Sequence, residues 1–309
     1  TVHGGNVHIR TIESGVPSLR CYAAESGKLR WSTATSPEMK KLFWLSDPAV
    51  AYGLAIAVFL ELGDMNSHGV AAVDLETGKL RWKTYLVTGN TGIKTNNRYL
   101  LSTLHLGPPA VDSGEVYTST GLSSVAALNA FSGEVKWVST YPRLQFGDPR
   151  YGQAWSGYDL RLCTAKTLAR GPLSPVVCGE MLIVAPKDCA AVIALERQSG
   201  NIRWQREFVD FRYIAGLAEN GVLLCDDTVT ALNVSTGAVS WEYALSEQSL
   251  FGQPVLSGGT LYLPTDRELQ HVDARTGVLK SAMPWDPRVG PLGNLVLNGS
   301  HLVGIGSSV

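Results

Sequence analysis

The stretch "AAVDLETGKLRW" (71–82) decides the fold, because close copies of it recur along the chain. Aligned on the glycine, the six copies are "CYAAESGKLRW" (21–31), "AVDLETGKLRW" (72–82), "ALNAFSGEVKW" (127–137), "ALERQSGNIRW" (194–204), "ALNVSTGAVSW" (231–241) and "HVDARTGVLKS" (271–281). The seventh position is always glycine: Gly27, Gly78, Gly133, Gly200, Gly237 and Gly277. Tryptophan closes five copies, as Trp31, Trp82, Trp137, Trp204 and Trp241, and Ser281 closes the sixth. Such self-similarity indicates a repeat architecture.

Each copy predicts a β-hairpin. Val73 and Leu75 alternate with Ala72 and Asp74, the period of two that is typical of a strand. The glycine then supplies the positive φ of a tight turn. The chain returns as a second strand that ends on the tryptophan. An isolated hairpin is marginally stable in water, so we expect each tryptophan to be buried against the neighbouring repeat.

The third position of the repeat carries Asp or Asn in four copies: Asp74, Asn129, Asn233 and Asp273. Carboxylates in a recurring pattern could indicate acid–base chemistry. These residues recur at a turn, however, where such side chains fold back onto backbone amides. We therefore predict that they cap the turns.

Two further strands are expected before each hairpin. The segment "SPVVCGEMLIVAPKDCAAVIALERQSGNIRW" (174–204) predicts four short strands separated by Gly, Pro and Asp. The run "AVAYGLAIAVFL" (49–60) is too short to span a bilayer and predicts two strands of the second blade. The segments 36–45 and 156–169 are the only ones for which a helical turn or two is expected. Four-stranded units repeated in this way predict an all-β fold, a β-propeller.

The two ends of the chain suggest that the propeller continues beyond this sequence. The first repeat follows shortly after Thr1, with no Met or leader, and "LVLNGSHLVGIGSSV" (295–309) predicts two strands of a further blade. We expect a single propeller domain over 1–309, with about six blades plus a partial one and an insertion at about 141–171. The parent propeller is expected to have seven or eight blades.

The pattern Ala-x-Asp-x-x-Thr-Gly-x-x-x-Trp resembles the tryptophan-docking repeat of the quinoprotein-type, PQQ-like (pyrroloquinoline quinone) β-propeller family. That family includes the PQQ dehydrogenases and the non-enzymatic outer-membrane assembly lipoprotein BamB. The resemblance covers nearly the whole chain except 139–170, and it is specific for the fold rather than for the function. It implies a bacterial protein of the periplasm or cell envelope.

The resemblance leaves three classes of function open. The first is a non-catalytic scaffold of the BamB-like kind, which binds a protein or a small ligand. The second is a sensor propeller fused to another domain, such as a kinase. The third is a PQQ-dependent dehydrogenase. A formal net charge of −1, with the basic residues dispersed, argues against nucleic acid as a partner.

Cysteine and histidine give no cofactor motif. The five cysteines (Cys21, Cys163, Cys178, Cys189 and Cys225) show no C-x-x-C spacing, which argues against a zinc or redox site. Those in strand-like runs are expected to pack as buried thiols, although Cys178 and Cys189 could alternatively bridge two strands. The family's PQQ alcohol dehydrogenases carry two adjacent cysteines, which this sequence lacks.

The six histidines are dispersed: His3, His8, His68, His105, His271 and His301. We expect ordinary surface or strand positions for them, with His271 marking a degenerate last repeat. No position matches the calcium ligands or catalytic Asp of the dehydrogenases. We therefore expect no cofactor, neither PQQ nor calcium, no metal site and no catalytic residue.

One segment breaks the repeat and is rich in Tyr, Arg, Trp and Asp: 141–171. Loops that depart from a rigid scaffold often carry function, and these residue types dominate binding hot spots. The candidate partner-binding residues are Tyr141, Arg143, Phe146, Arg150, Tyr151, Trp155 and Tyr158. The alternative is that the segment is structural and covers a face of the propeller or packs on another domain.

Overall fold

The computed structural model describes residues 1–13, 15–63, 65–89, 105–142, 171, 173–189, 191–207, 211–286, 288, 290–299 and 301–306. The chain divides into two compact units. Unit 1 comprises Thr1–Tyr158, Pro172–Ala190 and Leu195–Ile202, and unit 2 comprises Asp159–Gly171, Ala191–Ala194 and Arg203–Val309. The expectation of a single domain over 1–309 stays a prediction. Within the described ranges, no helix is long and apolar enough to cross a lipid bilayer.

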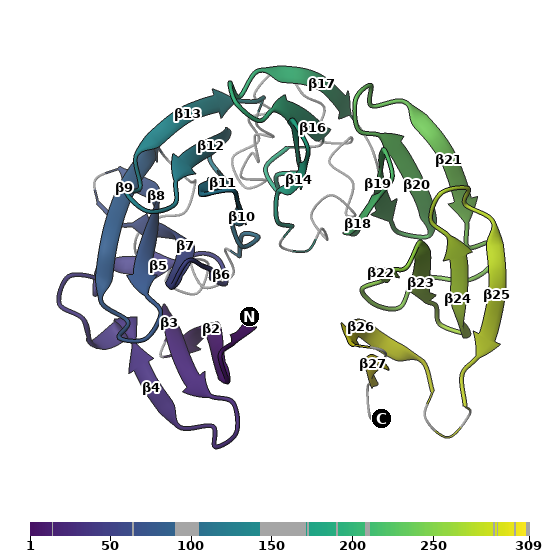
Figure 1. Ribbon diagram of the computed structural model, residues 1–309, viewed down its shortest axis with the longest axis horizontal. Coiled ribbons are helices and arrows are strands. Elements are labelled where there is room, and N and C mark those ends of the chain that lie inside the picture. The colour runs from purple at the N-terminus through teal and green to yellow at the C-terminus, as the bar shows by residue number, and fades with distance from the viewer. Residues whose placement is uncertain are drawn as a thin grey trace, which may run out of the picture. The chain divides into compact units, whose positions relative to one another are not determined.

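Unit 1 contains three complete antiparallel sheets, whose strands apart from β1 are labelled in Figure 1. The first consists of β1 (Val2–His3), β2 (Asn6–Glu13), β3 (Val16–Ala23) and β4 (Leu29–Ser32). The second consists of β5 (Leu42–Trp44), β6 (Ala49–Ala51), β7 (Leu54–Glu61), β8 (Asn66–Asp74) and β9 (Leu80–Gly89). The third consists of β10 (Ala110–Asp112), β11 (Glu115–Ser119), β12 (Ser124–Asn129) and β13 (Val135–Thr140).

A fourth sheet has residues in both units: β14 (Val176–Cys178), β15 (Met181–Val184), β16 (Ala191–Glu196) and β17 (Ile202–Glu207). The fifth sheet, in unit 2, consists of β18 (Tyr213–Ala218), β19 (Gly221–Cys225), β20 (Thr228–Asn233) and β21 (Val239–Ala244). The sixth consists of β22 (Val255–Ser257), β23 (Thr260–Pro264), β24 (Glu268–Asp273) and β25 (Leu279–Pro284). A two-stranded sheet of β26 (Leu292–Asn298) and β27 (His301–Gly306) follows.

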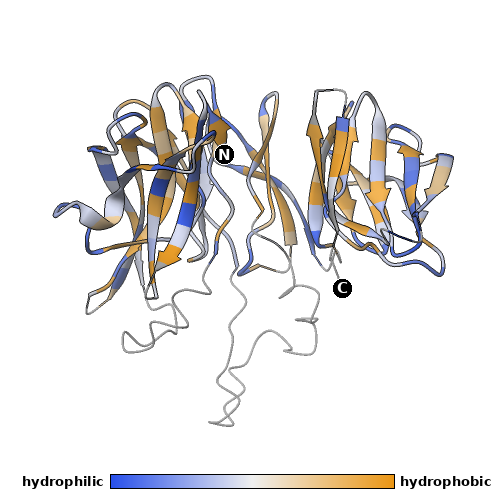
Figure 2. Ribbon diagram, turned by 90° about the horizontal axis from the view of Figure 1, so that it is seen from below, coloured by the Kyte–Doolittle hydropathy of each residue, from blue (hydrophilic) through white to orange (hydrophobic). Residues whose placement is uncertain are grey.

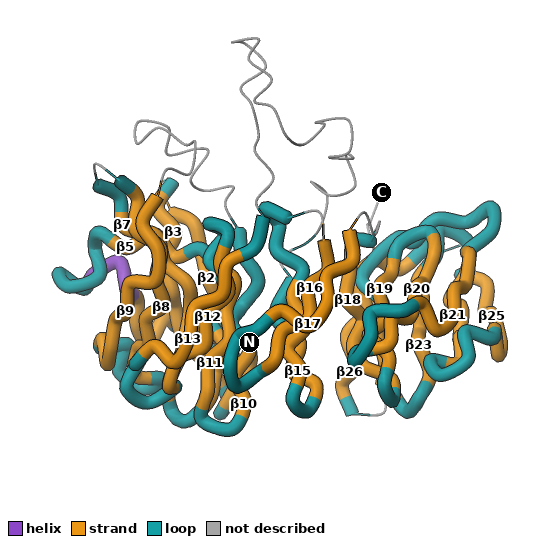
Figure 3. Tube along the Cα trace, turned by 90° about the horizontal axis from the view of Figure 1, so that it is seen from above, coloured by secondary structure: helices purple, strands orange, loops and turns teal. Residues whose placement is uncertain are grey.

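These sheets confirm the predicted all-β fold, with six sheets of four-strand layout and a two-stranded one among the described residues. The four strands expected in 174–204 and the two in 49–60 are present. In 36–45, where a helical turn or two was expected, Met39 N donates to Ser36 O (3.2 Å) and Leu42 N donates to Met39 O (2.9 Å), so the segment forms turns, but no helix is assigned there. A short 3-10 helix, η1 (Thr33–Thr35), precedes segment 36–45 and is purple in Figure 3. Strand β5 lies within segment 36–45. Segment 156–169 lies outside the described residues.

The period of two explains the strand at Leu42–Trp44. Leu42 and Trp44 are buried and Phe43 is half-buried, so alternate side chains face the core. Strands β5 and β6 both pair antiparallel with β7, at its two ends. They therefore act as one interrupted inner strand, and the second sheet keeps the four-strand layout of the others.

The hydrophobic core lies between successive sheets. Leu19 and Cys21 of the first sheet cluster with Ala57 and Phe59 of the second. In unit 2, Leu223 of the fifth sheet clusters with Leu261 of the sixth. Figure 2 shows the corresponding bands of hydrophobic residues, in orange, along the strands. Apolar area buried between sheets is the main favourable contribution to stability in such a stack.

Candidate interaction surface

The six repeat turns have the predicted backbone conformation. Each repeat glycine has positive φ, between 66° at Gly27 and 74° at Gly200. Asp74 Oδ1 accepts hydrogen bonds from Glu76 N (3.2 Å) and Thr77 N (2.9 Å). Asn129, Asn233 and Asp273 accept the equivalent bonds. The polar third position therefore caps the turn, as predicted.

The tryptophan of one repeat lies over the glycine of the next. A β-carbon placed on Gly133 would lie 2.5 Å from Cε3 of Trp82, and one on Gly277 would lie 2.5 Å from Cε3 of Trp241. The indole nitrogens donate to backbone carbonyls of the next hairpin: Trp31 to Leu75 (3.0 Å), Trp82 to Ala130 (3.0 Å), Trp137 to Arg197 (2.9 Å) and Trp204 to Val234 (2.7 Å). Trp31 and Trp82 are buried, and the other three are half-buried.

A second set of tight turns lies beside these hairpins. Each joins the first and second strands of a sheet, as at Tyr52–Gly53 and Ser113–Gly114, which all have positive φ. Leu75 N donates to Gly53 O and Ala130 N donates to Gly114 O, both at 2.9 Å. These bonds fix each turn to the hairpin of its own sheet. The two sets of turns in unit 1 together form what we call the turn surface.

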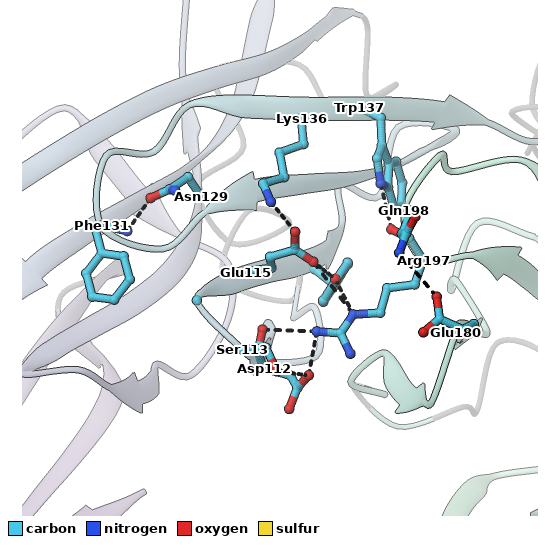
Figure 4. A network of polar contacts seen from close by, with 12 residues as sticks. Asp112, Ser113, Glu115, Asn129, Phe131, Lys136, Trp137, Glu180, Arg197 and Gln198 are labelled. Carbon is cyan, nitrogen blue, oxygen red and sulfur yellow. Dashed lines mark hydrogen bonds and ion pairs between the residues drawn. The ribbon is translucent and has the colours of Figure 1, made fainter.

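A charged network ties together the part of the turn surface shown in Figure 4. The Arg197 guanidinium pairs with Asp112 Oδ2 (Nη2 at 2.5 Å) and Glu115 Oε2 (Nε at 3.6 Å). Its Nε also donates to Tyr117 Oη at 2.6 Å. Lys136 and the Tyr117 hydroxyl both donate to Glu115. The two carboxylates, Asp112 and Glu115, are balanced by the two cations, Lys136 and Arg197. A network without net charge suits the attachment of one sheet to the next, which we call a joint, better than the binding of an ion.

The pKa values agree with a closed network. A hydrogen bond from Ser113 and the pairing with Arg197 hold the pKa of Asp112 below its usual value. Burial opposes ionisation of Glu115, but hydrogen bonds from Lys136 and Tyr117 lower its pKa overall. Burial and the bond to Glu115 raise the pKa of Tyr117 to about 12. At neutral pH the carboxylates are therefore charged and the phenol is neutral.

An exposed aromatic pair lies at the joint between the second and third sheets. The rings of Tyr52 and Phe131 are 5.0 Å apart between centroids, with an interplanar angle of 42°. Tyr52 is 51% exposed and Phe131 is 62% exposed. The Tyr52 hydroxyl accepts a hydrogen bond from Gly114 N at 2.9 Å, which fixes the tyrosine across the joint. Sequence reasoning missed this pair, although Phe131 is visibly the only apolar residue at the fifth repeat position.

The segment predicted to recognise a partner is only partly described. Tyr141 is 5% exposed, and its hydroxyl donates to Asp188 Oδ1 at 2.6 Å. Its place on an exposed recognition surface is therefore wrong, because the buried phenol needs that partner and packs inside unit 1. Arg143, Phe146, Arg150, Tyr151, Trp155 and Tyr158 lie outside the described residues.

The described cysteines and histidines have structural surroundings. Cys21, Cys189 and Cys225 are buried, and Cys178 is a half-buried free thiol, so the alternative Cys178–Cys189 bridge is wrong. His271 contacts Ser281 Oγ through Nδ1 at 2.9 Å and packs on Tyr262. Among the described residues, no three His, Cys, Asp or Glu side chains gather where they could hold a metal ion.

One curated relative and two solved structures place the chain among known proteins. The outer membrane protein assembly factor BamB of Yersinia pestis is 24% identical over 230 residues, which are 63% of this chain and 56% of that protein. This chain thus spans little more than half of that relative's length.

The solved structures are similar in fold. The crystal structure of BamB from Moraxella catarrhalis has a TM-score of 0.62 at 18% identity, over 98% of this chain and 77% of that one. The quinohemoprotein alcohol dehydrogenase ADHIIG from Pseudomonas putida HK5 has a TM-score of 0.63 at 14% identity, over 98% of this chain and 60% of that one. At these identities the likeness shows the β-propeller fold alone.

The sequence family is more specific than the fold. The family model described as outer membrane protein assembly factor BamB matches residues 1–91, 66–210 and 191–295, which overlap to cover nearly all of the chain. The resemblance expected from the Gly–Trp repeat is thereby confirmed. This chain belongs to the BamB family of PQQ-like β-propellers.

Proposed function

We propose that this chain is a non-catalytic scaffold of the bacterial periplasm, which binds a protein partner and takes part in the assembly of outer-membrane proteins. The family match along nearly the whole chain carries this proposal, because the family is named for that role. The turn surface supports it, since a rigid array of sheets holds many short loops in fixed positions, the arrangement that binding proteins use.

The scaffold role assigns a structural task to the repeat residues. We propose that each tryptophan docks its sheet onto the next by covering the glycine and bonding to the hairpin carbonyl, as Trp82 does with Gly133 and Ala130. Within the network of Figure 4, the charged groups of Asp112, Glu115, Lys136 and Arg197 neutralise one another across a joint. Partner binding then falls to side chains that project from the array. Segment 141–171, apart from Tyr141, stays a predicted contact region.

A gene deletion tests the assembly role. In the source organism, loss of the gene should lower the amounts of β-barrel proteins in the outer membrane, and the wild-type gene should restore them. A Trp82→Ala variant, which undoes one docking contact, should restore them poorly. Unchanged outer-membrane protein levels in the deletion strain would contradict the proposal.

A cofactor titration tests the non-catalytic part. Purified protein should show no saturable change in PQQ absorbance when PQQ and Ca²⁺ are added, and no dye-linked oxidation of alcohols. Stoichiometric binding at micromolar PQQ would instead assign the chain to the dehydrogenases. Because this measurement needs no partner protein, its result is independent of the deletion experiment.

A further inference from the structure

Two residues depart from the repeat pattern at one joint. The fifth repeat position is polar in the other five copies: Glu25, Glu76, Gln198, Ser235 and Arg275. In the third copy it is Phe131. The turn that faces it begins with Tyr52, where the corresponding turns have Gly4, Ser113, Gly179, Glu219 and Gly258. The two departures meet in the aromatic pair between the second and third sheets.

Neither residue suits its position for local reasons. Tyr52 has a φ of 54°, a left-handed conformation that disfavours a bulky residue and favours Gly or Asn. Phe131 gains little from burial, since 62% of its surface is exposed. Local preference therefore argues against both rings. The bond from Gly114 N to the Tyr52 hydroxyl and the contact between the two rings hold the pair in place, but they leave more than half of each side chain exposed.

The equivalent joint in unit 2 shows that the fold does not need an aromatic pair there. Glu219 begins the corresponding turn with a φ of 51°, and Arg275 occupies the fifth repeat position. Arg275 Nε lies 4.0 Å from Glu219 Oε1, and both side chains are more than two-thirds exposed. A weak surface ion pair thus fills the place that Tyr52 and Phe131 fill in unit 1.

The charges around the pair indicate the kind of partner. Glu76 lies next to Leu75, whose amide binds the Tyr52–Gly53 turn, and Glu134 lies in the hairpin of Phe131. Both residues are exposed. Lys79 is an exposed cation in the hairpin of Glu76, and Asp112 is already paired with Arg197. On the same two hairpins Arg81 pairs with Asp74 and Lys136 pairs with Glu115. Glu76 and Glu134 then stand against the single cation Lys79, an excess of one negative charge on the hairpins that flank the aromatic pair.

We propose that Tyr52 and Phe131 form a docking point for an extended polypeptide segment of a partner protein, one that presents an apolar side chain beside a Lys or Arg. The apolar group would pack on the exposed rings, and the cation would bind Glu134 or Glu76 and the face of an aromatic ring. This inference rests on the proposed scaffold function and names the surface and the partner chemistry for it.

Selection from a random dodecapeptide phage library tests the docking point. The wild-type chain is the target, and the Tyr52→Ser/Phe131→Ser double variant removes peptides that bind elsewhere. Enriched peptides should combine an apolar residue with Lys or Arg. Measured by fluorescence anisotropy, their affinity for the double variant should be weaker by about 30-fold, the loss typical of a hot spot. A Tyr52→Asn variant suits the turn and separates loss of the ring from loss of folding.

Two further variants sharpen the result. Glu76→Lys/Glu134→Lys should weaken the same peptides by about tenfold and flatten their salt dependence. Glu219→Ser/Arg275→Ser changes the equivalent joint in unit 2 and should leave binding within about twofold of wild type.

Several outcomes would overturn the docking point. Peptides that bind wild type and double variant equally would refute this surface and leave the scaffold function standing. An empty selection, or enrichment of acidic peptides, would refute the partner chemistry. Co-sedimentation with phosphatidylglycerol vesicles that is lost in the double variant would assign the rings to a lipid surface instead.

Discussion

Replacing Gly133 by alanine tests whether the tryptophan contacts hold successive sheets together. The matched control is Gly27→Ala. Both glycines close a repeat turn in unit 1 with nearly the same φ, 73° at Gly133 and 66° at Gly27. A β-carbon at Gly27 would meet nothing within 4 Å, whereas one at Gly133 would lie 2.5 Å from Cε3 of Trp82 and 2.7 Å from its Cδ2.

The expected cost follows from this geometry. At either position an alanine adopts a left-handed conformation, at a cost of about 1–2 kcal/mol. At Gly133 the indole must also retreat by about 1 Å to reach an ordinary contact distance. This strains or breaks the bond from Trp82 Nε1 to Ala130 O, worth about 1 kcal/mol, and adds overpacking of about 1–3 kcal/mol. We expect about 1–2 kcal/mol for Gly27→Ala and about 3–6 kcal/mol for Gly133→Ala.

Urea unfolding followed by circular dichroism measures both costs. The double variant Trp82→Ala/Gly133→Ala separates the indole contact from the rest of the cost, because without the indole the new methyl group should cost only the left-handed strain and its close approach to Thr84 Oγ1, at 2.8 Å. The two single changes should therefore be strongly non-additive. Equal costs for Gly27→Ala and Gly133→Ala, or additive costs in the double variant, would refute the docking role of the tryptophan.

Three further predictions concern polar and thiol groups. Arg197→Ala should lower the free energy of unfolding by about 1–3 kcal/mol through the lost bonds to Tyr117 and Asp112, and Arg197→Lys should restore only part of it, as urea midpoints will show. Burial lowers the pKa of His8 below its usual value of 6.5, so at pH values below 6.5 the unfolded chain binds a proton that the folded chain does not. The melting temperature should therefore decrease as the pH is lowered from 8 to 5, and it should decrease less in a His8→Leu variant. Burial raises the pKa of the Cys225 thiol, so Ellman's reagent should label Cys178 in the native protein and Cys225 only on unfolding, whereas fast native labelling of Cys225 would contradict its burial.

The repeat made the fold predictable from the sequence. Glycine at a fixed position with a capping residue four positions earlier dictates a turn, and the period-two pattern around it dictates the strands. Segment 36–45, for which a helical turn or two was expected, ends instead in strand β5. There the burial of Leu42 and Trp44 on β7 outweighs local propensity, which sequence reasoning sees only weakly.

The interaction surface was less predictable. The network of Asp112, Glu115 and Arg197 joins residues more than eighty positions apart. The sequence around Arg197 therefore does not indicate which carboxylates it pairs with. Tyr141 was expected on an exposed surface, because the sequence does not show that its hydroxyl bonds to Asp188, a residue far along the chain. Phe131 was within reach, since the repeat alignment isolates it, but its significance depends on Tyr52 facing it across the joint.

Four of the five repeat indoles, those of Trp31, Trp82, Trp137 and Trp204, donate to a peptide carbonyl, and this has a consequence for how such a chain diversifies. The residues that supply it carry unrelated side chains: Leu75, Ala130, Arg197 and Val234. The hydrogen bond of the indole therefore depends on the position of the main chain and not on the identity of the side chain. A newly duplicated repeat is coupled to its neighbour from the moment it arises, and its outward-facing positions are then free to drift. Divergence of one copy towards a new ligand, as at Phe131, leaves the coupling of all the others intact.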